Sequence, residues 1–97
     1  MSITRINEFH AKDGRADDLR KFLTSVIPAI ESSAGCQSCQ LLQSLDDPTR
    51  LVVVETWESV EAHQTAVKSI PPNNFAEIMK MLAETPKSAY FRSCDGK

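Results

Sequence analysis

The sequence predicts an α+β fold of the ferredoxin-like type, a four-stranded antiparallel sheet with helices on one face. Three observations lead to this prediction. The expected elements follow the order β-α-β-β-α-β, an Asp-Asp-Pro-Thr turn joins the two central strands, and Pro71 and Pro72 break the second helical segment. The 97 residues are enough for one domain, which we expect to span residues 1–97.

The first third of the chain predicts a strand followed by a helix. Residues 3–11 form a short segment that ends at a Lys-Asp-Gly turn, which favours a strand. After Gly14, apolar residues recur at the spacing of one helix face. They are Leu19, Phe22, Leu23, Val26, Ile27 and Ile30. We expect Gly35 to end this helix, because glycine readily adopts the left-handed conformation found at helix ends.

The centre of the chain predicts an antiparallel hairpin made of residues 36–45 and 50–58. The second of these strands contains Val52, Val53 and Val54, which are β-branched residues on both of its faces. Such a strand is expected to be covered on both sides. Helices cover only one face of this fold, so we expect a homodimer that packs sheet against sheet.

The last third predicts a broken helix and a final strand. Ser59 can cap a short helix, and Asn74 with Glu77 three residues later resembles a capping box at the start of a second helical piece. Residues 87–94 read as the fourth strand.

Composition excludes several classes of function. The net charge is −2, and no cluster of Lys and Arg offers a surface for nucleic acid or anionic lipid. No segment approaches the roughly 20 apolar residues of a membrane span, and the N-terminus has no signal-peptide pattern. We expect a cytoplasmic protein whose three cysteines stay reduced.

Cys36 and Cys39 form a Cys-x-x-Cys motif, which suggests a redox or metal site. A redox motif of this kind needs a helix N-terminus, whereas this one opens a strand. Residues three apart in a strand point to opposite faces, so the two thiols should diverge. Zinc needs further ligands, and Cys94 lies in the distant last strand. We therefore expect plain strand cysteines and no metal.

Other residues are better candidates for chemistry. By strand parity Val53, Glu55 and Trp57 share one face, and His63 lies on the apolar stripe of the following helix. Together they could line a pocket between sheet and helices. The simpler alternative is that Trp57 is a core residue and His63 a packed, hydrogen-bonded one.

Three strand residues complete the candidate set. Asn7 lies in the middle of the first strand, where asparagine is depleted, so its presence needs a reason. Either its amide has a functional role, or the amide points outward or is bonded to water. Tyr90 and Arg92 share one face of the last strand and could supply a hydrogen-bond donor.

The chain resembles the antibiotic biosynthesis monooxygenase domain family over its whole length. The similarity lies in the series Phe-x-x-Lys-Asp-Gly, then Ala-Gly-Cys at a strand start, Asp-Asp-Pro in the hairpin and Val-Val-Val-Glu-Thr-Trp-Glu-Ser-Val-Glu-Ala-His. The resemblance implies a dimeric α+β barrel with a pocket in each subunit. It also implies a cofactor-independent monooxygenase that uses O₂ to oxidise a small phenolic or quinol-type aromatic to a quinone.

In that reaction the resemblance implies Trp57 as pocket wall and ring donor, His63 as base and Asn7 as orienting amide. With an unperturbed pKa of about 6.5, a histidine suits a base near neutral pH. Two positions depart from the family pattern. Ala66 stands where many members have a histidine, and Val53 stands where some have an asparagine.

These departures keep other functions open. A non-catalytic dimeric barrel that binds a small hydrophobic ligand is the main alternative, since a fold does not fix a function. Haem degradation is disfavoured by the missing iron ligand. An isomerase or hydrolase of a small carbonyl compound would need a second acid or base, for which Glu55 is the candidate.

Overall fold

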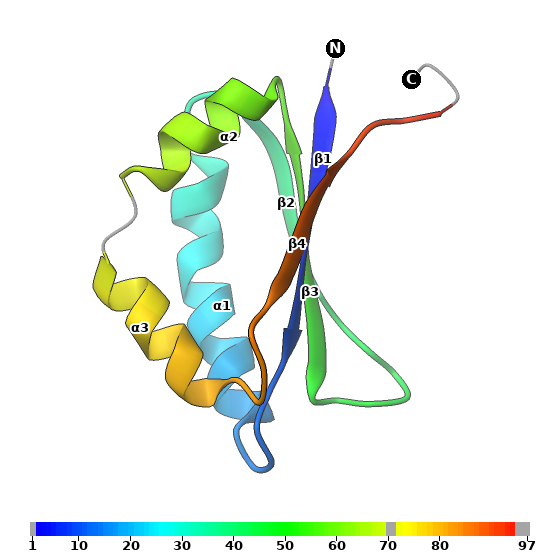
Figure 1. Ribbon diagram of the computed structural model, residues 1–97, viewed down its shortest axis with the longest axis vertical. Coiled ribbons are helices and arrows are strands. Elements are labelled where there is room, and N and C mark those ends of the chain that lie inside the picture. Colours follow the sequence, from blue (N-terminus) through cyan, green and yellow to red (C-terminus); the bar gives the residue numbers. More distant parts are fainter. Residues whose placement is uncertain (1, 70–71, 95–97) are drawn as a thin grey trace.

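A computed structural model describes residues 2–69 and 72–94 of the chain. The predicted order β-α-β-β-α-β is confirmed, with the second helical segment in two pieces. The elements are β1 (Ile3–His10), α1 (Ala16–Glu31), β2 (Cys36–Gln43), β3 (Arg50–Trp57), α2 (Val60–Val67), α3 (Pro72–Met81) and β4 (Lys87–Phe91). The strands form an antiparallel sheet in the order β2-β3-β1-β4. All three helices lie on one side of it, as the ferredoxin-like prediction requires (Figure 1).

Strand β3 crosses the centre of the sheet and shows the alternation that the sequence predicts. Its odd-numbered residues from Leu51 to Trp57 are buried towards the helices, whereas Val52 and Val54 on the other face are only partly buried. Leu51 has no exposed surface, and burial of a leucine side chain contributes about 1.5–3 kcal/mol. The core of the described residues consists of Ala11, Leu19, Leu23, Cys39, Leu51, Val53, Met81 and Leu82.

The helix ends agree with the sequence in part. Ser59 caps α2 as predicted, since its hydroxyl accepts a hydrogen bond from the backbone N–H of Ala62 at 3.0 Å. The predicted capping box at Asn74 is wrong, because α3 begins at Pro72 and Asn74 lies within its first turn. A proline is well suited to the first helical position, where the missing N–H costs no hydrogen bond. Pro71 lies outside the described residues.

Gly35 does not end α1, which stops at Glu31; it lies in the turn that leads into β2. Its φ is +87°, a conformation that side-chain-bearing residues rarely adopt. A Cβ at this position would lie 2.6 Å from the Cβ of Ala62. Glycine is thus needed here both for the turn and for the close approach of α2.

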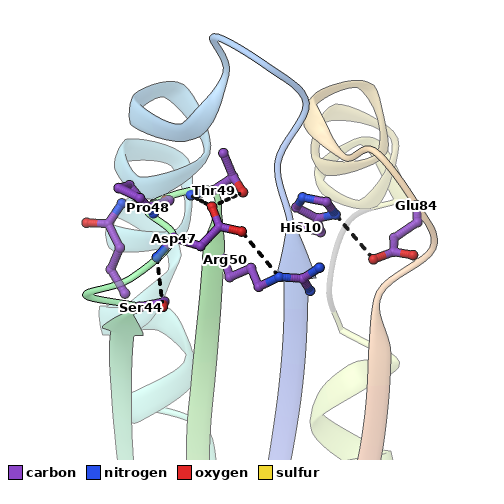
Figure 2. Close-up of polar contacts among 8 residues, drawn as sticks. His10, Ser44, Asp47, Pro48, Thr49, Arg50 and Glu84 are labelled. Atoms are coloured by element: carbon purple, nitrogen blue, oxygen red, sulfur yellow. Dashed lines mark hydrogen bonds and ion pairs between the residues drawn. The ribbon is translucent and has the colours of Figure 1, made fainter.

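The two strands of the hairpin are joined by a turn built around Asp47. Its carboxylate accepts hydrogen bonds from the backbone N–H and the hydroxyl of Thr49, at 3.1 and 2.6 Å (Figure 2). These bonds lower the pKa of Asp47. At the same end of the sheet, Nδ1 of His10 lies 3.3 Å from the carboxylate of Glu84 (Figure 2). This contact links β1 to the segment between α3 and β4.

The predicted divergence of Cys36 and Cys39 is wrong. A bulge between Cys36 and Ser38 shifts the register, so Cys36 lies opposite Trp57 and Cys39 opposite Glu55. Residues opposite each other share a face, so both cysteines are on the helix side of the sheet. The thiols are free, and burial raises the pKa of Cys39 to about 12. A reactive thiolate needs the opposite shift.

Candidate functional site

A cavity of about 610 Å³ lies between the sheet and the helices. Helices α1 and α3 contribute mainly apolar side chains to its walls, whereas its ionisable side chains come from the sheet and from α2. The apolar set includes Phe22, Val26, Ile30, Phe75 and Ile78 from α1 and α3. The polar set includes Arg5, Asn7, Glu55 and His63 from β1, β3 and α2. Its volume is within the range of pockets that hold small organic molecules, roughly 300–1,000 Å³.

Glu55 is the centre of a hydrogen-bond network on the sheet side of the cavity. The residue is 6% exposed, and its carboxylate accepts from the indole N–H of Trp57 at 2.8 Å and from the amide of Asn7 at 2.9 Å. Burial raises the pKa of Glu55, while the bonds from Trp57 and Asn7 and the charge of Arg5 oppose that rise. The ring donor that the family resemblance implies for Trp57 is therefore already engaged.

His63 faces the cavity from α2 and is also 6% exposed. Its ring packs edge-on against Trp57 and against Tyr90, each with 5.3 Å between ring centroids. Its Nδ1 lies 2.6 Å from the hydroxyl of Tyr90. Burial first, and the charge of Arg5 second, lower the pKa of His63 to about 4. The expectation of an ordinary histidine pKa is wrong, and His63 is neutral at pH 7.

The sequence reasoning missed Arg5. It lies on β1 opposite Glu55 on one side and opposite Tyr90 on the other, and it lines the cavity. Its guanidinium carbon is 4.8 Å from the centroid of the Tyr90 ring. The signal was available, because Arg5 is two residues before Asn7 and so shares its face of the strand.

The structure brings together most of the residues that the sequence singled out. Asn7, Val53, Glu55, Trp57 and His63 all line the cavity. Tyr90 contacts His63 but is 37% exposed and is not part of the described lining.

Arg92 is the predicted residue that the structure does not bring to this cluster. Strand β4 ends at Phe91, so Arg92 lies one residue beyond it. Its side chain is exposed and is absent from the described lining of the cavity.

Comparison with known proteins assigns the chain to a family. The model of the antibiotic biosynthesis monooxygenase family matches residues 2–80. The chain belongs to this family. No curated protein sequence matches it.

Solved structures resemble this family member along almost the whole chain. Rv0793 from Mycobacterium tuberculosis is 23% identical with a TM-score of 0.86, and the match covers 98% of this chain and 97% of the Rv0793 chain. A conserved protein from Methanosarcina mazei is 17% identical with a TM-score of 0.87, with coverage of 96% and 93%. SnoaB from Streptomyces nogalater, a cofactor-independent oxygenase, is 16% identical with a TM-score of 0.81, again with coverage of 96% and 93%. At these identities the likeness establishes the fold.

Two further findings concern metal binding and membrane spans. Among residues 2–69 and 72–94, no three His, Cys, Asp or Glu side chains gather in a geometry that could hold a metal ion. No helix in the described part of the chain is long and apolar enough to cross a membrane.

Proposed function

We propose that this protein is a cofactor-independent monooxygenase that oxidises a small phenolic or quinol-type aromatic to a quinone with O₂. The observation that carries the proposal is the cavity between sheet and helices, with the buried, uncharged His63 beside the Glu55 network. Membership of the monooxygenase family and the fold shared with a cofactor-independent oxygenase support it.

The apolar wall is suited to an aromatic ring. Phe22, Phe75 and Ile78 would bury the ring, while the polar side chains lie on the sheet and, for His63, on α2. A ring packed against this wall would be shielded from water on that side.

The substrate must lose its phenolic proton before it can react with O₂. Triplet O₂ reacts slowly with closed-shell molecules, but a phenolate can transfer one electron to it. The resulting superoxide and ring radical combine to form a hydroperoxide on a ring carbon. Loss of water from that carbon leaves the quinone, so one oxygen atom enters the product and the other leaves as water.

His63 would accept the phenolic proton and return it to the peroxide oxygen that leaves as water. This role requires the tautomer in which the Nδ1–H of His63 donates to the Tyr90 hydroxyl, so that the unprotonated Nε2 accepts the proton of the substrate. The lowered pKa keeps His63 unprotonated at neutral pH, so its ring is available there as a base, although a weak one. Glu55 would position the side chains of Asn7 and Trp57 beside the ring.

We also propose that the protein acts as a homodimer through the open face of the sheet. Leu42 and Phe91 lie on this face and are each 50% exposed, and Ile6 and Val54 are partly exposed between them. A contiguous apolar surface of this kind is typical of an interface. Sedimentation equilibrium should give twice the chain mass of 10.8 kDa, and a monomer at micromolar concentration would contradict the proposal.

The function is tested by oxygen uptake with metal-free, cofactor-free protein and a panel of dihydroxynaphthalenes. We expect uptake above the autoxidation rate, with one O₂ consumed per quinone formed. His63→Gln should lower the rate by about 10²-fold or more, the usual contribution of a general base. His10→Gln is the matched control, since His10 lies at the opposite end of β1 from Arg5 and outside the described lining of the cavity.

A specific observation favours one alternative. The indole N–H of Trp57 and the amide of Asn7 both donate to Glu55, so these donors are engaged within the protein and not directed at a reacting oxygen. If the panel gives no uptake but binds, the protein is a non-catalytic module for small hydrophobic ligands.

A further inference from the structure

Arg5 occupies an unusual electrostatic position on the sheet. It lies directly between Glu55 of β3 and Tyr90 of β4 on the helix-facing side. An arginine and a glutamate directly opposite each other on neighbouring strands commonly form an ion pair. Here both carboxylate oxygens of Glu55 instead accept hydrogen bonds from the neutral donors of Trp57 and Asn7.

The guanidinium of Arg5 is therefore left without a carboxylate at ion-pair distance among the described residues. It lies over the Tyr90 ring, which attracts a cation weakly. Arg5 is partly buried and lines a largely apolar cavity. Glu55 is near enough for Arg5 to lower its pKa, yet the two groups form no ion pair among the described residues, so a second anion in the cavity would gain a charge-assisted contact with the guanidinium.

His63 and Arg5 converge on the same ring. Arg5 stacks on the face of Tyr90, and His63 contacts the hydroxyl of Tyr90. The cation is close enough to His63 to lower its pKa. A ligand atom beside His63 in the cavity would therefore experience the positive charge of Arg5 as well.

We propose that Arg5 binds the ionised oxygen of the substrate, so that the cavity selects phenols and quinols in the form of their oxyanions. This inference rests on the proposed function, because it concerns the substrate of the same site. The substrate O–H bond breaks, the proton passes to His63 or to solvent, and the oxyanion stays against the guanidinium. Arginine suits this role because it remains charged and presents several N–H donors in one plane.

The inference also resolves a difficulty in the proposed reaction. A neutral histidine with a lowered pKa is too weak a base to hold the proton of an ordinary phenol by itself. A fixed cation beside the oxygen lowers the pKa of the phenol and so shifts that balance towards the anion, against the smaller effect of the same charge, which also lowers the pKa of His63.

The test uses a ligand that cannot react with O₂. 4-Nitrophenol has distinct absorption spectra as phenol and phenolate, so its ionisation can be followed in the bound state. Titration of the complex with pH should give a bound-phenol pKa about 1–3 units below that of the free phenol, the usual effect of a close opposite charge. Glu55, His63 and Tyr90 are the other ionisable groups that face Arg5, and all three are present in every variant compared.

Three variants separate the charge of Arg5 from its bulk. Arg5→Met should abolish most of the shift, and Arg5→Lys should retain part of it. Arg20→Met, which removes an arginine from the exposed side of α1, should leave it unchanged. Binding of the neutral analogue nitrobenzene should be equal in wild type and Arg5→Met. Should Arg5→Met fail to fold, Arg5→Gln provides the same comparison.

Each outcome has a definite meaning. A shift of the same size in wild type and Arg5→Met overturns the role of Arg5 and leaves the proposed oxygenase function standing. No binding of nitrophenol to the wild type overturns the role of Arg5, and the oxygen-uptake measurement then decides the oxygenase function independently. A shift that depends on Arg5, without oxygen uptake for any quinol, supports the anion site and overturns the oxygenase.

Discussion

Lowering the pH from about 7.5 to about 5 is expected to destabilise the fold through His63. This side chain is 6% exposed and its pKa is about 4 in the folded chain, against 6.5 for the ordinary group. Between these two values the unfolded chain binds a proton that the folded chain does not. Stability therefore rises with pH through this window and falls as the solution is acidified.

The magnitude follows from the two pKa values. The contribution of His63 to the free energy of unfolding should decrease by about 2 kcal/mol at pH 5 and by about 3 kcal/mol at pH 4. Glu55 acts in the opposite direction, because its raised pKa means that on acidification the folded chain takes up this proton before the unfolded chain does. The effect of His63 must therefore be measured as a difference between proteins that both keep Glu55.

Urea unfolding at a series of pH values measures this difference. With a urea dependence of about 1 kcal/mol per molar for a chain of this size, the midpoint should fall by about 2 M more in wild type than in His63→Gln between pH 7.5 and 5. His10→Gln is the matched control, because His10 is the other histidine of the chain and should leave the acid sensitivity intact. Protein concentration is kept constant, since dimerisation would couple to unfolding. Equal loss of stability in wild type and His63→Gln would refute the reasoning.

Two further predictions concern the glycines and the cysteines. Gly35→Ala should destabilise the protein by more than Gly14→Ala, as measured by thermal unfolding. Both residues have positive φ, so Gly14→Ala should cost about 1 kcal/mol from its backbone conformation alone. At Gly35 the new Cβ would in addition lie 2.6 Å from the Cβ of Ala62. Equal losses would show that α2 moves aside at no cost. Cys39 should react with a thiol reagent at pH 8 many times more slowly than the exposed Cys94, because it is buried and its pKa is raised to about 12. Similar rates in the native protein, followed by mass spectrometry of labelled peptides, would mean that β2 opens readily.

Periodic patterns gave the reliable part of the sequence prediction. The spacing of 3.6 identified α1, and the alternation along β3 placed Val53, Glu55 and Trp57 on one face. Both patterns are local, because each residue's direction depends on its own element. The element order then limited the fold to a few topologies.

Local patterns failed where the chain departs from regular geometry. The bulge between Cys36 and Ser38 reverses the strand parity on which the predicted divergence of the cysteines depended. The start of α3 at Pro72 moved Asn74 into the helix. Neither event leaves a clear signal in the neighbouring residues, because bulges and helix starts are set partly by packing against other elements.

The sequence by itself determined the order of the elements, the face that β3 turns to the helices and the residue types available there. Only the tertiary structure decided what those residues do to one another. Asn7 meets Glu55 across 48 positions of sequence, and His63 meets Tyr90 across 27. Packing of α2 against the sheet buries His63 near Arg5, which lowers its pKa to about 4, and the donors gathered around Glu55 leave Arg5 without a carboxylate at ion-pair distance in the described chain. The reason is that hydrogen bonding and desolvation depend on neighbours in space, which strand register and helix packing select.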